Sequence, residues 1–491
     1  MSSKSFQNAS KLNGIVSVLQ FGAVGDGVTD DTAAIQAAID YAVSIHAKVV
    51  LPAGTYLLNT KYDSGLAPIA IGPYCLRVQN ASGFSITGEG IGVTKLITGN
   101  SASLAQQTFI YNCSNFEFSG IEAVGNNFGL TAGQNNGALL LYGVSNFLVE
   151  NIKTSIFQGS QIVGDWWWDG SFRNIYQSVP ELASGFDCAF LQNIKINNHV
   201  AVGTNGSGQG VQCSYDAPGA SANPTGLTLN YGMTNNVRIS NSNYTQFNVG
   251  VFFNESRDIW IEGNNFYNNY KTSGDYVSGV IFDMHSAITG YNLNIVNNTF
   301  SKNGSGSGTA GYRGGVFLNA AIGQLQVFSQ NNKYIDNKDS GIFVYNGASV
   351  FLQSLGDYFG NTITANQTKS IANSPVTQVA YTPVVSTSSG TITSYTASGL
   401  YKLIGTTCIL NVVISVTNNG TGAGVFNVTL PIPHRASGIG SAFYGRETAA
   451  TGLGLTGFAN IASNDFQIST SSGLYPAGTG YILFGTLIYE I

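Results

Sequence analysis

A loose repeat runs through the sequence from about residue 80 to 360 and constrains the fold more than any other feature. Each unit contains a glycine, a short apolar strand, a polar turn, a second strand of alternating polarity, and an Asn-rich turn that ends in an aromatic residue. One unit cannot bury a hydrophobic face by itself, so the repeat predicts a stack of similar units. The clearest units begin at Gly250, Gly279, Gly315 and Gly341, and less regular copies begin at Gly137, Gly185 and Gly210.

Units of about 22 to 36 residues with several short strands are typical of a parallel β-helix, in which each turn hydrogen-bonds to the next at about 4.8 Å. A body of about 280 residues, at about 25 residues per turn, gives about 11 turns and about 50 Å of stacked length. Asn and Gly suit the corners, because both tolerate left-handed backbone angles.

Composition supports an all-β chain and excludes several functions. Only 9% of the residues are charged, whereas 12% are aromatic and 61 of 491 are glycine, which argues against a disordered chain and against a helical bundle. The net charge of −5 and the absence of a basic run argue against a nucleic-acid partner. No apolar stretch reaches 18 residues, and the N-terminus lacks the apolar core of a secretory signal. We therefore expect no membrane span. We also expect the chain to be synthesised in a bacterial cytoplasm.

No metal or cofactor motif is apparent in the sequence. The five cysteines are scattered and are expected to be buried thiols; Cys188 and Cys213 recur at equivalent strand positions, but we expect no disulfide between them. The glycines of residues 88–92 superficially resemble a phosphate loop, but a strand follows them where that loop requires a helix. We expect neither a cofactor nor a metal.

A helix and a second β region flank the repeat. Apolar residues follow a 3.6-residue period from Asp31 to about Ser44, and Asp30 and Asp31 stand where carboxylates cap a helix. The repeat stops near residues 371–375, and alternating runs rich in Thr, Ser and Val follow. The predicted domains are an N-terminal arm at residues 1–18, a β-helix at 19–372, and a C-terminal β-sandwich at 376–491 for trimerisation or glycan binding.

Three N-terminal segments resemble the opening of pectate-lyase-like β-helix proteins. They are FGAVGDGVTDDTAAIQAAI at 21–39, LPAGTY at 51–56 and ITGEGIGVTKLI at 86–97. The resemblance covers about the first 100 residues directly, and the repeats extend it to about 360. It implies a right-handed parallel β-helix with a short N-terminal capping helix and, after it, the C-terminal antiparallel β domain. It does not choose a chemistry, because the family includes lyases, hydrolases, epimerases and binding proteins.

The C-terminal region, with TPVVSTSSGTITSYTASGLYKLIGTT at 382–407, looks like the terminal domains of phage tail fibres and tailspikes. This resemblance implies a homotrimer in the virion tail that acts on a bacterial capsule, exopolysaccharide or O-antigen outside the host cell. We expect no N-terminal head-binding domain of the kind that many tailspikes have, because only about 18 residues precede the helix motif. We expect attachment through this short arm or through a phage tail or baseplate adaptor.

The glycine alignment predicts an elongated polar strip on one outer face. Positions one and three after the glycine are apolar, as in Val251 and Phe253, and alternation directs them inward. Such a strip suits a saccharide chain, which needs amides and phenols for its hydroxyls and two acids for glycosidic chemistry. Positions two and four point outward and carry Asp187, Gln212, Ser214, Asn254, Asp283, Asn319 and Tyr345, with Tyr215, Asp216, Glu255 and His285 just beyond.

Glu255 and Asp283 are the preferred catalytic pair, because they occupy neighbouring turns one alignment position apart. Asp216 and Asp187 are the next candidates. The alternative for these acids is a role in turn backbones or in a subunit interface. Trp167 belongs to three consecutive tryptophans on a strand, so at least one should face outward, to bind a sugar or to pack on a neighbouring subunit. The expected substrate-binding residues are Trp167, Asn254, His285, Asn319, Gln212 and Tyr215.

These features favour a depolymerase that hydrolyses glycosidic bonds. A polysaccharide lyase stays open, because it needs a base and a cation beside a uronate carboxylate, and Arg238, Arg257 and Arg313 lie near the relevant turns. A receptor fibre that binds glycan without cutting it is a second class of function. A secreted plant-polysaccharide enzyme would require a signal peptide.

Overall fold

The structure is a computed structural model, and its chain separates into two compact units. The first comprises Met1–Leu352 with Asp357–Ser370, and the second comprises Gln353–Gly356 with Ile371–Ile491. The described residues are 14–62, 73–102, 105–126, 136–180, 183–206, 208–214, 233–271, 277–284, 291–306, 313–320, 325–345, 350–360, 364–365, 379–404, 407–434, 441–459 and 464–491.

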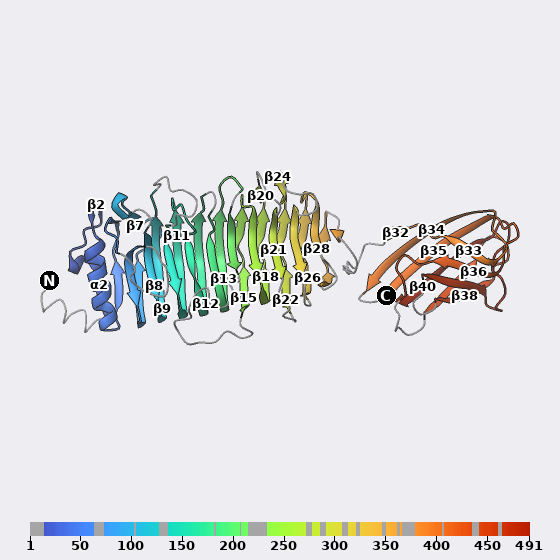
Figure 1. The fold of residues 1–491 in the computed structure, drawn as a ribbon, viewed down its shortest axis with the longest axis horizontal. Helices are drawn as coiled ribbons and strands as arrows, with labels where there is room; N and C mark the ends of the chain where they lie inside the picture. Colours follow the sequence, from blue (N-terminus) through green and yellow to red (C-terminus); the bar gives the residue numbers. More distant parts are fainter. Residues whose placement is uncertain are drawn as a thin grey trace. The chain divides into compact units, whose positions relative to one another are not determined.

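The first unit is the predicted parallel β-helix, in which strands stack side by side from blue to orange in Figure 1. Its strands form three columns. The first column contains β5 (Tyr74–Gln79), β8 (Gln106–Tyr111), β10 (Leu139–Tyr142), β14 (Gln209–Ser214), β17 (Val249–Asn254), β21 (Val277–Met284), β25 (Arg313–Ala320), β28 (Ser340–Tyr345) and β31 (Thr364–Ala365).

The second column lies across one corner from the first. It contains β1 (Ile15–Ser17), β3 (Lys48–Leu51), β6 (Ser82–Gly88), β15 (Thr234–Ser240), β18 (Ser256–Glu262), β22 (Tyr291–Val296), β26 (Leu325–Gln330) and β29 (Val350–Leu355). The third column contains β2 (Asp26–Asp30), β4 (Gly54–Leu58), β7 (Thr94–Thr98), β16 (Asn243–Thr245), β19 (Asn265–Tyr267), β23 (Thr299–Ser301), β27 (Lys333–Ile335) and β30 (Tyr358–Phe359).

Four longer strands continue around the corners. β9 (Ser114–Val124) and β11 (Val144–Ser155) belong to the second and third columns, and β12 (Ile162–Ser178) and β13 (Phe186–Val202) belong to all three. The short β20 (Tyr270–Lys271) and β24 (Ser305–Gly306) pair with each other. The strands bend at single residues with positive φ, mostly asparagines, as the composition predicted. They include Asn146, Asn193 and Asn236 at the first corner and Asn174, Asn198 and Asn297 at the second.

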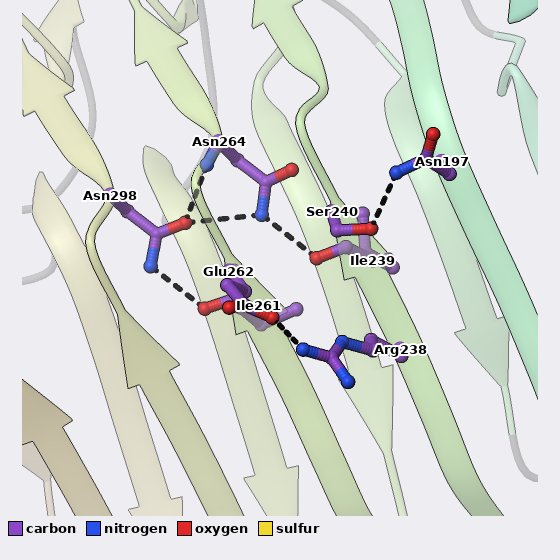
Figure 2. A network of polar contacts seen from close by, with 8 residues as sticks. All are labelled: Asn197, Arg238, Ile239, Ser240, Ile261, Glu262, Asn264 and Asn298. Carbon is purple, nitrogen blue, oxygen red and sulfur yellow. Dashed lines mark hydrogen bonds and ion pairs between the residues drawn. The ribbon is translucent and has the colours of Figure 1, made fainter.

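Buried asparagines run through the interior beside the second corner. Asn298 accepts hydrogen bonds at its Oδ1 from the backbone N–H and the side-chain amide of Asn264, and it donates to the carbonyl of Ile261 (Figure 2). Asn332 repeats these contacts on the next turn. The ladder satisfies backbone groups that a buried corner would otherwise leave unpaired. It accounts for the Asn-rich turn of the repeat.

Aromatic residues of the third column stack inside the solenoid. Ring centroids of Phe266 and Phe300 lie 4.8 Å apart, those of Phe300 and Tyr334 lie 5.0 Å apart, and each pair is tilted by only 3°. Tyr244 and Phe359 extend the stack at its two ends. Because one ring per turn occupies the same register, the repeats from β16 to β30 each end in an aromatic residue.

A helix closes the N-terminal end, as predicted. α2 (Thr32–Ser44) buries Ile35, Ala38 and Ile39 against the first turns, and the short 3-10 helix η1 (Val18–Phe21) lies beside it. A second 3-10 helix, η2 (Asn100–Ala102), follows β7. The proposed cap is correct for Asp30, which accepts from the Thr32 N–H. It is wrong for Asp31: its buried carboxylate accepts the N–H groups of Val24 and Gly25 and so fixes the preceding loop.

The chain joins the solenoid earlier than expected. β1 pairs in parallel with β3, with Ile15 opposite Lys48, so the predicted arm at 1–18 extends too far into the sheet. Residues 1–13 lie outside the described part of the chain.

The second unit is one antiparallel sheet around a single hydrophobic cluster. At one end of the sheet, the Tyr381 hydroxyl donates to the carbonyl of Thr429, which lies next to the opposite end, so the sheet curls into a half-barrel. The predicted sandwich of two sheets is therefore wrong. In spatial order the strands are β32 (Val379–Tyr381), β34 (Ser394–Ile404), β35 (Thr407–Asn418), β40 (Ile482–Glu490), β37 (Ala442–Glu447), β38 (Gly454–Ala459), β39 (Asp465–Thr470), β36 (Ala423–Thr429) and β33 (Val385–Ser389).

Candidate functional site

The first column has the register that the glycine alignment predicted. Val251 pairs with Val280, and Phe253 pairs with Phe282, and all four side chains are fully buried. The same inward rows continue through β14, β25 and β28. The inward assignment is confirmed, and residues at positions two and four therefore face outward.

The outer face of this column is only partly polar. Its second positions from β21 to β28 are apolar: Ile281, Phe317 and Phe343 form a buried cluster with Phe252 packed against it. From β12 to β25, its polar residues are Asp187 and Gln212 at the second positions and Asp165, Ser214, Asn254, Asp283 and Asn319 at the fourth. We call these seven residues the polar strip.

Hydrogen bonds within the first turns of the polar strip fix its side chains. The Ser160 hydroxyl donates to Asp187 Oδ2 at 3.2 Å. Gln212 accepts from the Ser184 hydroxyl at 3.4 Å and donates to Ser214 Oγ at 2.9 Å. Asp187, Gln212 and Ser214 are all half-buried, so these groups are ordered and still open to a ligand.

Asp283 lies between two amides farther along the polar strip. It is paired with Asn254 on one side and with Asn319 on the other. Asn319 donates its amide to Asp283 Oδ1 at 2.7 Å and is itself buried. The three residues are therefore neighbours on the outer face, as their positions in the glycine alignment predicted.

Glu255, the other member of the predicted catalytic pair, is not on the outer face. It occupies a left-handed corner at φ 47° and is only 4% exposed. Its Oε2 accepts the hydroxyl of Tyr291, which is fully buried, at 2.7 Å. The expectation that Glu255 belongs to the polar strip is wrong, because the corner turns its side chain away from the alternation of β17.

The tryptophan run contributes differently from the prediction. Trp167 is fully buried and donates its indole N–H to the carbonyl of Leu141, so it is not a surface platform for sugar. Its neighbours pack in a separate cluster: Trp166, half-buried, stacks on Phe190 at 4.2 Å, and Trp168, which is buried, lies 6.0 Å from Trp166. These three rings form an aromatic flank beside Asp165.

Three other predicted site residues, Tyr215, Asp216 and His285, lie outside the described residues. Within the described part of the chain, no group of three His, Cys, Asp or Glu side chains is arranged to hold a metal ion. No helix among the described residues is long and apolar enough to span a membrane.

Asp165 and Asp187 are the two acids of the polar strip that lie on adjacent turns. Asp187 pairs with Val163 and Asp165 pairs with Ala189, so the acids are diagonal neighbours with Cα atoms about 8 Å apart. Both carboxylates lie close to the buried Cys188 thiol. Burial, the neighbouring Cys213 thiol, and then the charges of Asp187 and Asp165 raise the pKa of Cys188.

Sequence reasoning missed Asp165 as a member of the polar strip. Its unit has Gln161 in place of the glycine that anchored the alignment. Counting four residues from Gln161 would have found it, because Gln161 takes the position that Gly185 has on the next turn.

Comparison with known proteins identifies the family. A family described as rhamnogalacturonase A/epimerase, pectate lyase-like, matches residues 15–268, which is just over half of the chain. The protein therefore belongs to the pectate-lyase-like family, as its N-terminal motifs indicated. Mannuronan C5-epimerase AlgE1 of Azotobacter vinelandii is 39% identical over 121 residues, 23% of this chain; the matched part is 8% of that epimerase.

Solved structures with the same fold include phage tailspikes. The Dettilon tailspike protein has a TM-score of 0.54 at 15% identity, over 98% of this chain and 95% of that chain. The tailspike of Escherichia coli bacteriophage HK620, solved in complex with a hexasaccharide, has a TM-score of 0.47 at 12% identity, over 98% and 94%. At 15% identity, the likeness to the Dettilon tailspike concerns the fold.

Proposed function

We propose that this chain is a tailspike-type depolymerase that binds a bacterial surface polysaccharide along the polar strip and hydrolyses its glycosidic bonds. The observation that carries the proposal is the pair of half-buried acids, Asp165 and Asp187, on adjacent turns of an otherwise nearly uncharged face. Membership of a family whose description names a rhamnogalacturonase and an epimerase supports action on a polysaccharide. The tailspike fold supports a phage origin.

The two acids divide the work of hydrolysis between them. The Ser160 hydroxyl donates to Asp187 and holds its carboxylate in place, so we assign Asp187 as the nucleophile or the base. Asp165, beside the aromatic flank, is then the acid that protonates the leaving oxygen. Glycosidases hold such carboxyl groups about 5 Å apart when a covalent intermediate forms and about 6.5–9.5 Å apart when water attacks directly. A Cα separation of about 8 Å on parallel strands is compatible with either.

The rest of the polar strip provides contacts for neighbouring sugar units. From β12 to β25 it spans five steps between turns, or about 24 Å. Gln212 and Asn254 offer amide donors and acceptors for hydroxyl groups, and Asp283, held by the buried Asn319, accepts from them. Tyr345 continues the row on β28 and offers an aromatic face.

The test replaces each acid with its amide. Asp187→Asn and Asp165→Asn should each lower the cleavage rate by about 10²–10⁴-fold, because positioned proton transfer is worth that much. Polysaccharide binding should survive in both. Asp336→Asn, which alters an exposed acid at a corner with φ 51°, is the matched control and should cleave normally. Cleavage within tenfold of the unmodified protein in both variants would remove this pair from the active site.

The same assay tests the roles of Glu255 and Asp283. Asp283→Asn should weaken polysaccharide binding more than it lowers the cleavage rate, because Asp283 lies three turns from Asp187. Glu255→Gln should mainly lower stability, since it disturbs a buried bond to Tyr291. A loss of rate confined to these two variants would favour the pair predicted from the sequence.

A second candidate is removal of the proton beside a uronate carboxylate, the first step of a lyase or an epimerase. The 39% identity with a mannuronan C5-epimerase over 121 residues favours it. Products separate the possibilities: new reducing ends alone indicate hydrolysis, and the ultraviolet absorbance of an unsaturated uronate indicates a lyase. Inverted C5 configuration at unchanged chain length indicates an epimerase. Binding with none of these products would indicate a receptor fibre.

We infer the assembly from the same resemblance. In this proposal the chain is a homotrimer held by its C-terminal unit. It is attached to the phage tail or to a baseplate adaptor through its N-terminus. It would then act as part of the virion, outside the host cell.

A further inference from the structure

A long hollow lies on the second column, around the corner from the polar strip. It consists of two adjoining parts with volumes of about 700 and 490 Å³, which meet at Asp169 and Ser171. The larger part extends back to Lys48, and the smaller part extends forward to Trp260. None of the seven residues of the polar strip lines either part. The hollow is therefore a separate surface, and we call it the basic groove.

One outward row of side chains runs along the length of the basic groove. Along the register, Ser171 is followed on successive turns by Lys195, Arg238 and Trp260. The row continues backward through the second column to Lys48 on β3. Seven steps from β3 to β18 at about 4.8 Å give a trough about 34 Å long.

The cations of the basic groove are mostly without ionic partners. In the described part of the chain, Lys48, Arg173 and Lys195 make no ion pair within 4 Å, although all three line the groove. Arg238 pairs with Glu262 on the neighbouring strand (Figure 2). Lys195 stands directly opposite Arg238, and like charges in that position repel each other. A bound anion would relieve this repulsion.

The remaining groups of the groove suit a sugar chain. Trp260 is 39% exposed, with the Arg238 guanidinium 5.8 Å from its ring centroid, and a flat indole is a stacking surface for a sugar ring. Asn193 and Asn236 line the corner and present amides. Two acids also line the groove, and each accepts a hydrogen bond from a neighbour: Glu117 from Ser119 and Asp169 from Asn193.

We propose that the basic groove binds an acidic oligosaccharide, with Lys48, Arg173, Lys195 and Arg238 contacting its carboxylates and Trp260 stacking on a ring. The chain as a whole carries a net charge of −5 and only 20 Lys and Arg residues, so its overall charge does not attract polyanions. The attraction comes from the cations that line the groove. This binding is independent of cleavage at the polar strip and would hold an acidic polymer on the molecule between cleavage events.

The experiment measures binding of hexamannuronate, a uniformly acidic probe, by calorimetry on the full chain carrying Asp187→Asn to limit turnover. Maltohexaose is the neutral probe of equal length. We expect hexamannuronate to bind and maltohexaose to bind at least tenfold more weakly. The double variant Arg173→Ala with Lys195→Ala should lose at least tenfold in affinity for hexamannuronate. Both side chains are exposed and without ion pairs in the described residues, so the fold should be unaffected.

Two further variants locate the binding. Trp260→Ala should also weaken the binding of hexamannuronate. Lys333→Ala removes an exposed cation on the third column and should leave that binding unchanged. Equal affinity for maltohexaose, or affinity for inorganic polyphosphate as high as for hexamannuronate, would overturn the proposal. So would unchanged hexamannuronate binding in the double variant. None of these outcomes depends on whether Asp165 and Asp187 are catalytic.

Discussion

At the scale of single residues, a buried histidine makes the stability of the solenoid dependent on pH. His199 is fully buried, and its two ring nitrogens contact Gln177 Oε1 at 2.7 Å and the Tyr244 hydroxyl at 3.2 Å. Burial lowers the pKa of His199 from 6.5 to about 3. The unfolded chain therefore binds a proton below pH 6.5 that the folded chain rejects until about pH 3. The free energy of unfolding should fall by about 1.4 kcal/mol per pH unit in this window.

The variant His199→Gln isolates this contribution. Urea unfolding measured from pH 7 to pH 4 should give a shallower loss of stability in His199→Gln than in the unmodified chain. His46→Gln changes an exposed histidine and should leave the slope as it was. Identical slopes for all three proteins would show that His199 does not titrate as its burial requires.

The same scale shows where sequence reasoning succeeds and fails. Alternation correctly placed Val251 and Phe253 inward, because β17 is a regular strand. It failed at Trp167 and Glu255, because left-handed residues interrupt the alternation: Trp166 has φ 64° and Glu255 itself has φ 47°. Such angles are expected of Gly or Asn and are uncommon for Trp or Glu. The identity of these residues therefore gave no sign of the corner.

At the scale of elements, the inward aromatics of the first column carry much of its stability. Phe253 is fully buried, and its ring lies 6.1 Å from that of Phe282 on the next turn, tilted by 56° rather than stacked. Phe253→Ala should cost about 3–5 kcal/mol in the free energy of unfolding. Phe252→Ala removes the same ring from the half-buried outer side of the same strand and should cost clearly less. Equal losses in thermal unfolding would contradict the inward and outward assignment.

The asparagine ladder is a second element-scale device. Asn298→Ala removes the acceptor of two Asn264 donors and the donor to the carbonyl of Ile261, all buried. Each unpaired buried group costs about 1–3 kcal/mol, so the midpoint of denaturant unfolding should fall strongly. Asn294→Ala, on the outer face of the preceding strand β22, should change it little. A similar midpoint for the two variants would mean that water replaces the ladder.

Element order explains why the solenoid was predictable and the C-terminal sheet was not. In a solenoid each strand pairs with its counterpart one repeat away, as Val251 does with Val280, so the period of the sequence fixes the topology. In the second unit, β35 pairs with β40, more than 60 residues later, and β33 pairs with β36. No periodic signal marks such pairings. Alternation alone does not distinguish one curled sheet from two stacked sheets.

At the scale of the whole molecule, the outer face of the C-terminal sheet is an association surface in our proposal of a homotrimer. Phe484 lies opposite Val413, and Tyr444 lies opposite Thr486 in the centre of this face. Phe484 is 49% and Tyr444 70% exposed, and Ile488 adds a further exposed apolar side chain. Large exposed apolar side chains that gather on one face mark contacts between proteins. Three copies packed through this face would cover it.

Light scattering on the intact protein tests the trimer directly. Three chains of 51.7 kDa give an expected mass of about 155 kDa. The double variant Phe484→Asp with Ile488→Asp places charges on the apolar face and should shift the mass toward one chain, because buried unpaired charges are costly. Leu474→Asp alters a residue that is 66% exposed and lies outside the strands of that face, so it should keep the trimer. A mass near 52 kDa for the unmodified protein would refute the assembly. A full trimer in the double variant would assign the contact to another surface.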